Sequence, residues 1–264
     1  MVRRRRQHEV WWRWAAVVLA VVAIVVIVAA AGWGQASIVF PAPPQGREPA
    51  YPDQLVRSGG ATFLYFNGAR VVVYFHGNGE DLADSIPMVS LLRTLGVGVL
   101  AVEYPGYGVA GGRPSEQGAY AAGEAALQWL RSERGVDRDR VVLLGQSLGS
   151  AVATEMAKRG LGARLVLISP FTSAAEMARR IVPLFPAIFV RYRFDTLAKA
   201  SGIVMPVLII HGTEDEVVPF EMGQRLAGAF PQSQFVQIWG GMHNDLLSMH
   251  PLVVRKALAP FLKF

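Results

Sequence analysis

One serine stands between two glycines at the end of an apolar run, in the stretch LLGQSLGS at residues 143–150. A serine hydroxyl is a poor nucleophile near neutral pH, and it becomes reactive when a nearby base takes its proton. If a strand ends at Gly145 and a helix begins directly afterwards, the sharp turn between them exposes the Ser147 hydroxyl at the helix N-terminus. The spacing therefore predicts that Ser147 is held out as a nucleophile.

The Gly-x-Ser-x-Gly pattern is a weak signal by itself, and its context strengthens it. The preceding run VVLLG is typical of a buried strand, and residues 148–160 follow a helical pattern. The flanking glycines would let strand and helix approach closely. In this geometry the N–H of Leu148 points to the place where an oxyanion would form.

A nucleophilic serine needs a base, and histidine is the usual one. The chain has five histidines, His8, His76, His211, His243 and His250. His243 is the best candidate, because it follows the last predicted strand in GGMHND, where two glycines free its loop. His76 and His211 directly precede glycine at strand ends, which indicates structural or loop-shaping roles. His8 precedes a long apolar stretch, and His250 is expected on a helix surface.

The acid that orients the base is sought in GTEDEVVP, which offers Glu214, Asp215 and Glu216. Asp215 is favoured because a short carboxylate on a tight loop positions a histidine well. Glu214 and Glu216 fit a solvated acidic turn better.

Short β-branched runs alternate with helical segments from residue 70 onward, which predicts a three-layer α/β domain with a mostly parallel sheet. The predicted strands span 71–75, 97–103, 141–145, 165–169, 207–210 and 235–239, and the predicted helices span 81–95, 115–134, 148–160, 220–229 and 245–262. Before them, TFLYF and RVVVYF flank Asn67-Gly68, a strong signal for a β-hairpin.

Ligands of an open α/β sheet bind at the carboxyl ends of its strands. The segments that follow the predicted strands are HGNGED, YPGYG, QSLGS, HGTEDEVVP and GGMHND. Glycine and ionisable residues thus gather at one edge of the sheet, where the candidate serine, aspartate and histidine also lie.

The chain order of the three candidates, serine then aspartate then histidine, is that of α/β hydrolases. The motifs YFHGNGED, AVEYPGYG, GQSLGSAVA, SPFTS, RYRFDT and HGTEDEVVP resemble the α/β-hydrolase superfamily, within its membrane-anchored abhydrolase-domain serine hydrolases. The resemblance covers residues 37–262. It implies an α/β-hydrolase fold, a central sheet with helices on both faces and a small cap insertion, preceded by one transmembrane helix.

The resemblance also assigns roles. It implies that Ser147 is the nucleophile, Asp215 the acid and His243 the base. The HGN turn would supply one oxyanion N–H from Asn78, and Leu148 would supply the other.

Substrate contacts are expected from two regions. By the resemblance, Tyr104 and Tyr107 would line the rim of the site or brace the neighbouring loop. Residues 170–202 form a long segment between two predicted strands, which favours a cap, although a longer helix pair packed on the core would look the same. Apolar residues of this segment, Phe185 and Phe189 among them, would receive an acyl chain, and its arginines would meet anionic head groups.

The N-terminus carries a membrane signal. Residues 14–33 contain no charge, and twenty helical residues span about 30 Å, the thickness of a bilayer core. A cleaved signal peptide is the alternative, but its apolar stretch is usually only about 7–15 residues. We therefore predict a basic cytoplasmic segment at 1–13, a signal anchor at 14–33, a Pro-rich stalk at 34–53 and a catalytic domain at 54–264.

Charge supports this topology. Five arginines and one glutamate give the first 13 residues a charge of +4, out of a net +6 for the chain. By the positive-inside rule the N-terminus is cytoplasmic, and the domain lies outside, as in a single-pass protein of a bacterial inner membrane. The run of arginines could also be a nucleic-acid or twin-arginine export tag. The charge of only +2 over the remaining chain argues against a nucleic-acid partner.

The predicted activity is that of a membrane-anchored serine hydrolase that cleaves carboxylic esters or thioesters, including those of lipids or long acyl chains. No cofactor and no metal is expected. A peptidase-type amide hydrolase and a non-catalytic scaffold on the same fold are the alternatives. The chain has no cysteine, which excludes disulfides and thiolate chemistry. The sequence does not define the oligomeric state.

Overall fold

The computed structural model describes residues 36, 39–181 and 186–263. The predicted span at 14–33 and the basic segment before it lie outside these ranges. Within the described ranges, no helix combines the length and the apolar character that crossing a bilayer would require.

Eight strands form one sheet in the order β1-β2-β4-β3-β5-β6-β7-β8. The strands are β1 Leu55–Ser58, β2 Ala61–Phe66, β3 Val71–Phe75, β4 Gly98–Glu103, β5 Val141–Gln146, β6 Arg164–Ile168, β7 Val207–Gly212 and β8 Ser233–Ile238. All pairings from β4 to β8 are parallel, and β2 joins β4 antiparallel. The six strands predicted from β-branched runs are confirmed, with ends shifted by one or two residues.

The hairpin predicted at Asn67-Gly68 is wrong. Strand β2 does not pair with β3, because β4 lies between them. Gly68 instead allows a close approach of backbones, since a Cβ there would lie 2.1 Å from the amide nitrogen of Gly98. The actual hairpin joins β1 to β2 through Gly59-Gly60, and both glycines have positive φ as a tight two-residue turn requires.

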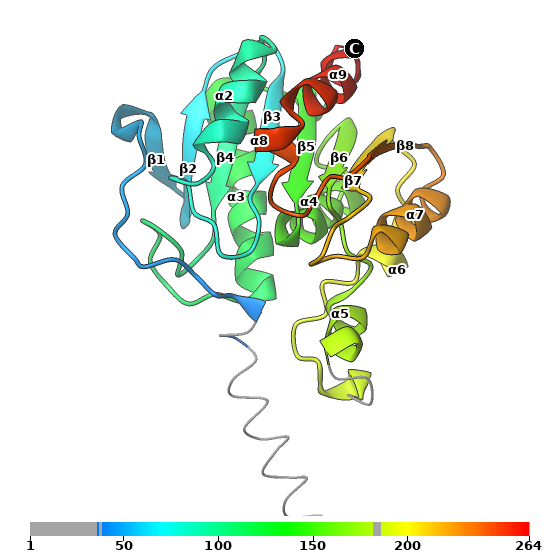
Figure 1. Cartoon of the computed structure of the whole chain (residues 1–264). Helices are drawn as coiled ribbons and strands as arrows, with labels where there is room; N and C mark the ends of the chain where they lie inside the picture. The colour runs from blue at the N-terminus through cyan, green and yellow to red at the C-terminus, as the bar shows by residue number, and fades with distance from the viewer. Residues whose placement is uncertain (1–35, 37–38, 182–185, 264) are drawn as a thin grey trace, which may run out of the picture.

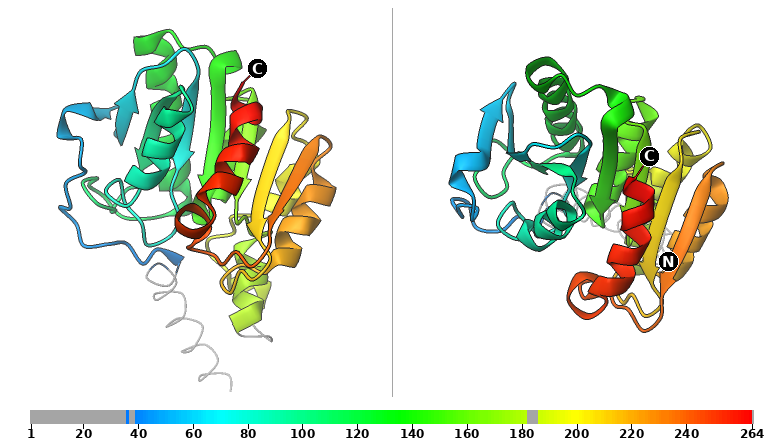
Figure 2. Two further views of the ribbon diagram at one scale, coloured as in Figure 1. Left: turned by 45° about the horizontal axis from the view of Figure 1, so that its top comes forward. Right: turned by 90° about the horizontal axis from the view of Figure 1, so that it is seen from above.

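Helices cover both faces of the sheet, as expected when its strands are apolar on both sides. On one face pack α3 Glu116–Arg134, α4 Leu148–Lys158, α6 Thr196–Ala200 and α7 Phe220–Ala229. On the other pack α2 Ile86–Thr94, α8 Leu246–Met249 and α9 Pro251–Leu262. Figure 1 shows α2, α8 and α9 in front of the sheet with α3 and α4 behind it, and Figure 2 shows the same three layers from two further directions.

Two segments reach beyond the three layers. Between β6 and β7 the chain forms α5 Ala174–Ile181 and the short helix η3 Ala187–Phe189, and α5 projects from the lower side of the domain in Figure 1. The described part of the predicted stalk lies against the domain on that same side. Its Phe40 is 4% exposed, and the N–H of Gly46 donates to the carbonyl of Gly108 at 2.9 Å. Short 3₁₀ helices lie at Pro52–Gln54 and Arg138–Arg140.

Candidate active site

The turn between β5 and α4 forces an unusual backbone conformation on Ser147. Its φ is 50° and its ψ is −116°, in a backbone region that residues other than glycine rarely occupy. The flanking glycines explain how the turn closes. A Cβ on Gly145 would lie 2.1 Å from the carbonyl oxygen of Gly149, and one on Gly149 would lie 2.0 Å from that of Phe75. Strand and helix therefore meet at a distance that only glycine permits, with the serine at the apex.

The three predicted side chains meet in a continuous chain of hydrogen bonds. Nε2 of His243 lies 2.9 Å from Oγ of Ser147. Nδ1 of the same ring lies 2.8 Å from Oδ2 and 3.0 Å from Oδ1 of Asp215. Because the carboxylate accepts the Nδ1 proton, the tautomer leaves Nε2 free to accept the serine proton. This arrangement can convert the serine hydroxyl into a nucleophile.

Asp215 receives an unusual number of donors. Its Oδ1 accepts the N–H groups of Val217 at 3.0 Å and Val218 at 2.7 Å, in addition to the ring of His243. Burial disfavours the ionised carboxyl, but hydrogen bonds from His211 and His243, together with the Val218 N–H, outweigh it and lower the pKa of Asp215 well below its usual range. The group is therefore a fixed negative charge next to His243.

A second histidine also contacts this carboxylate. Nε2 of His211 lies 3.1 Å from the carbonyl oxygen of Val218 and 3.2 Å from Oδ2 of Asp215. Since both neighbours accept, Nε2 carries the proton and donates to the two of them. The ring is fully buried, and Gly223 makes room for it, because a Cβ there would lie 2.3 Å from Nδ1 of His211. The loop-shaping role expected for His211 thus includes a direct contact with Asp215.

Two backbone N–H groups are free to bind an oxyanion beside Ser147. Within the described part of the chain, neither the N–H of Asn78 nor that of Leu148 donates to a protein acceptor, and both residues line the cavity at the serine. Gly77 cannot serve in the same way, because its N–H donates to Oε2 of Glu80 at 2.8 Å. The carboxylate of Glu80 therefore shapes the loop that presents Asn78.

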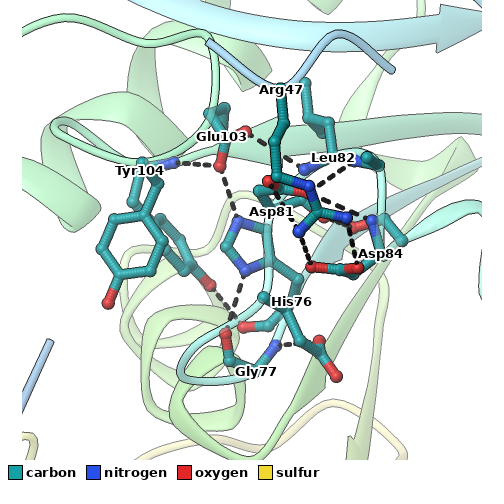
Figure 3. A network of polar contacts seen from close by, with 12 residues as sticks. Arg47, His76, Gly77, Asp81, Leu82, Asp84, Glu103 and Tyr104 are labelled. Atoms are coloured by element: carbon teal, nitrogen blue, oxygen red, sulfur yellow. Dashed lines mark hydrogen bonds and ion pairs between the residues drawn. The ribbon is translucent and has the colours of Figure 1, made fainter. Parts of the chain in front are cut away.

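A buried polar cluster supports this loop from below (Figure 3). Nε2 of His76 lies 2.9 Å from Oε1 of Glu103, and the Tyr104 hydroxyl donates to the carbonyl of His76 at 2.9 Å. Burial lowers the pKa of His76, but the hydrogen bond and the charge of Glu103 outweigh it and raise that pKa. The Tyr107 hydroxyl donates to Oδ1 of Asn78 at 3.2 Å. These contacts fix the first turn after β3.

A cavity of about 410 Å³ opens over Ser147, within the range of roughly 300–1,000 Å³ typical of small-molecule sites. Apolar side chains form most of its wall beyond the serine and histidine. They are Val39, Leu148, Phe171, Ala174, Met177, Ala178, Phe194, Val217 and Val218. The α5 residues in this set show that the insertion after β6 faces the cavity.

None of the described residues among the predicted substrate contacts lines the cavity, and each has a different position. Tyr104 and Tyr107 are 1% and 0% exposed and do not line the cavity, so they act as braces and not as rim residues. Phe189 is 39% exposed on η3 and does not line the cavity. The insertion reaches the cavity through α5 instead. Phe185 lies outside the described residues.

A hollow of about 670 Å³ lies beside α3, lined by residues such as Glu124, Arg131 and Asp137, and it shares no residue with the cavity at Ser147. We assign the site by its chemistry and not by the size of the hollow. In the described ranges, no cluster of three histidine or carboxylate side chains is arranged to hold a metal ion.

The comparisons with known proteins concern the family and the fold. The sequence model described as "Alpha/beta hydrolase family" matches residues 71–199. An uncharacterized protein of Mycobacterium tuberculosis is 36% identical over 232 residues, which cover 86% of this chain and 82% of that protein. The chain therefore belongs to the α/β-hydrolase superfamily.

Two further proteins are similar. Alpha/beta hydrolase domain-containing protein 17C of Xenopus tropicalis is 36% identical over 185 residues, which are 68% of this chain and 58% of that protein. The chain thus spans little more than half of this relative. The solved structure of an esterase from Pyrococcus furiosus aligns with a TM-score of 0.68 at 18% identity, covering 84% of this chain and 98% of that one. At this identity the likeness shows the fold.

Sequence reasoning missed Glu80 entirely and placed Glu216 on a solvated turn without a contact to the site. Glu80 lines the cavity and binds the N–H of Gly77, and its spacing of three residues from that glycine is a signal that could have found it. Oε2 of Glu216 accepts the N–H of His243 at 3.1 Å. That contact joins two residues 27 positions apart, and no local sequence pattern predicts it.

The contact of His211 with Asp215 generates a prediction. His211→Leu removes one donor from the carboxylate, and a hydrogen bond to a charged group is worth about 1.5–3 kcal/mol. We expect kcat for an ester substrate to fall roughly tenfold or more with little change in KM. His211→Gln can place an amide donor where Nε2 was and should recover most of the loss. Equal kcat values for the leucine and glutamine variants would contradict a role through this hydrogen bond.

Proposed function

We propose that this protein is a serine hydrolase that cleaves carboxylic esters or thioesters through an acyl-enzyme. One observation carries the proposal, namely the continuous chain from Ser147 Oγ through His243 to Asp215, with heavy-atom distances of 2.9 and 2.8 Å. Such a chain is the recurring arrangement for activating a serine hydroxyl. Membership of the hydrolase superfamily supports the same reaction class.

The proposed reaction follows from the positions of the groups. Oγ of Ser147 bonds to the acyl carbon while Nε2 of His243 takes the hydroxyl proton. The carbonyl electron pair moves onto its oxygen, which the N–H groups of Asn78 and Leu148 stabilise. The bond to the leaving oxygen or sulfur then breaks, and His243 returns the proton to it. Water repeats the same steps and releases the acid and the free serine.

The backbone of Ser147 weighs against a non-catalytic scaffold. A non-glycine residue in a sparsely populated backbone region costs on the order of 1–3 kcal/mol and persists where its surroundings impose it. Here the close glycine contacts impose φ 50° on the one residue whose hydroxyl meets the histidine. A binding scaffold would gain nothing from this strain, whereas a nucleophile needs the exposure that it provides.

A first experiment tests the nucleophile. Full-length protein should react with a fluorophosphonate probe, and Ser147→Ala should abolish that reaction while leaving the thermal unfolding midpoint nearly unchanged. Ser150→Ala is the matched control, since Ser150 lies on the same helix but its hydroxyl bonds the carbonyl of Ser147. Full labelling of the Ser147→Ala variant would move the nucleophile elsewhere.

We propose further that the acyl group occupies the apolar cavity, which favours medium or long acyl esters, those of lipids or acylated proteins included. The wall formed by Phe171, Met177, Ala178 and Phe194 supports this choice, because apolar surface favours an alkyl chain by about 25 cal/mol per Å² removed from water. A two-carbon acyl group would leave most of this wall uncovered.

A panel of p-nitrophenyl esters tests the acyl preference. We expect kcat/KM to rise from acetyl to octanoyl, and Ala178→Trp on α5 to reduce the ratio of octanoyl to acetyl about tenfold by filling the cavity. Ile188→Trp is the control, because Ile188 is 81% exposed and outside the cavity wall. A maximum at acetyl in the unaltered protein would exclude this substrate class and leave the hydrolase assignment intact.

We also propose that residues 14–33 anchor the protein in a membrane, with the N-terminus cytoplasmic and the hydrolase domain on the other side. The uncharged apolar run and the arginines before it support this topology. A reporter fused after Phe264 should be active outside the cytoplasm and accessible to protease from that side. Activity of a reporter that works only in the cytoplasm would reverse the orientation.

A further inference from the structure

The segment that joins the predicted anchor to the domain reaches into the candidate active site. We call residues 39–47 the strap. Its first residue, Val39, lines the cavity over Ser147 although 108 positions separate the two in the sequence. Figure 1 shows the blue start of the described chain on the lower side of the domain, where α5 also projects.

The strap contacts the part of the insertion that follows η3. The ring of Phe40 packs edge-on against Tyr192 and Phe194, with centroids 5.0 and 5.8 Å away, and Phe40 is 4% exposed. Phe194 is itself a wall of the cavity and has a positive φ of 40°. The Glu116 carboxylate accepts the N–H of Phe194 at 3.0 Å, which fixes the backbone around Phe194 to the start of α3. Val39 and Phe194 therefore line the same cavity, and Phe40 packs behind them against Phe194.

The strap also contacts the loop that presents Asn78. A Cβ on Gly79 would be in ordinary van der Waals contact with the carbonyl oxygen of Pro41, at 3.6 Å, so the strap passes next to this loop. Further along, the guanidinium of Arg47 donates to both carboxylate oxygens of Asp84 at 2.9 Å. It also lies 3.3 Å from the buried Asp81, whose Oδ1 accepts the N–H groups of Ala83 and Asp84 (Figure 3).

These contacts hold the strap against the domain at both of its ends. The bidentate geometry of Arg47 is directional, and Asp81 would otherwise be a buried carboxylate without a cation, which is costly. Phe40 contributes burial of an aromatic ring at the other end. Between them, the carbonyls of Gly106 and Gly108 accept hydrogen bonds from Gln45 and Gly46 at 3.4 and 2.9 Å. The strap is thus held as a part of the domain.

We propose that the strap is part of the acyl-binding site, with Val39 as a specificity-determining residue and the Arg47 contacts as the latch that holds it in place. The inference rests on the proposed function and extends it. The acyl chain lies between α5 on one side and the strap on the other, so the segment leading to the anchor sets the length of chain that the cavity accepts.

The test uses the full-length chain in a mild detergent and p-nitrophenyl esters from acetyl to dodecanoyl. Val39→Trp fills the cavity, and we expect the ratio of kcat/KM for octanoyl to that for acetyl to fall about tenfold or more. Val39→Ala enlarges the cavity and should move the optimum to a longer acyl chain. Val204→Trp is the matched control, since Val204 is 69% exposed and outside the cavity wall.

The latch is tested in the same assay. Arg47→Gln removes the ion pairs and leaves the buried Asp81 carboxylate without its cation, so the octanoyl-to-acetyl ratio should fall about fivefold, and an unchanged ratio would show that Arg47 is not a latch. Arg57→Gln on the exposed side of β1 is the control for loss of one arginine.

Two failures are distinguishable. If the unaltered protein hydrolyses esters and both Val39 variants, with unfolding midpoints close to that of the unaltered protein, keep its acyl-length profile, the strap inference is wrong and the hydrolase proposal stands. If the unaltered protein neither hydrolyses any ester of the panel nor reacts with a fluorophosphonate, the proposed function fails and takes the strap inference with it.

Discussion

The site depends on the contact between the end of β5 and the start of α4. Gly145 and Gly149 bring the two backbones closer than any side chain would allow. This short separation between strand and helix determines the backbone conformation of Ser147. Ser147 therefore takes a positive φ, and its hydroxyl points out of the sheet edge toward His243. The same contact places the first N–H of α4, that of Leu148, beside the hydroxyl. A single steric constraint thus positions both the nucleophile and one of the groups that would stabilise the charge it generates.

The second requirement is a negative charge that stays ionised while partly buried. Burial alone would favour a protonated Asp215, and the hydrogen bonds of His211, His243 and two backbone N–H groups reverse that preference. A charge held in this way stabilises the positive charge that forms on His243 when it takes the serine proton. The donors come from β7, from the loop after it and, for His243, from the loop after β8. The electrostatics are therefore built at the carboxyl ends of β7 and β8.

The sequence predicted the parts of this arrangement that are local. Runs of valine, leucine and isoleucine marked the parallel strands, and the glycine pattern at the end of β5 marked the turn, because both follow from short-range sterics. The pairing of β2 was mispredicted, since Asn67-Gly68 has the chemistry of a hairpin but β4 arrives from 30 residues further on to take the place beside it. Tyr104 and Tyr107 were ambiguous between wall and brace, and only their burial beneath the HGN turn decides the matter. Val39 carries no signal at all, because its role exists only through contacts with residues far away in the chain.

The residues that react and the residues that select the substrate are held in place by different kinds of contact. The reacting groups sit on turns at the ends of adjacent parallel strands, where the ladder of backbone hydrogen bonds fixes their spacing. Part of the cavity wall instead comes from α5, the residues around Phe194 and the strap, which are held by a few side-chain contacts such as Phe40 on Tyr192 and Arg47 on Asp84. Substitutions there would change the shape of the cavity without moving Ser147, His243 or Asp215.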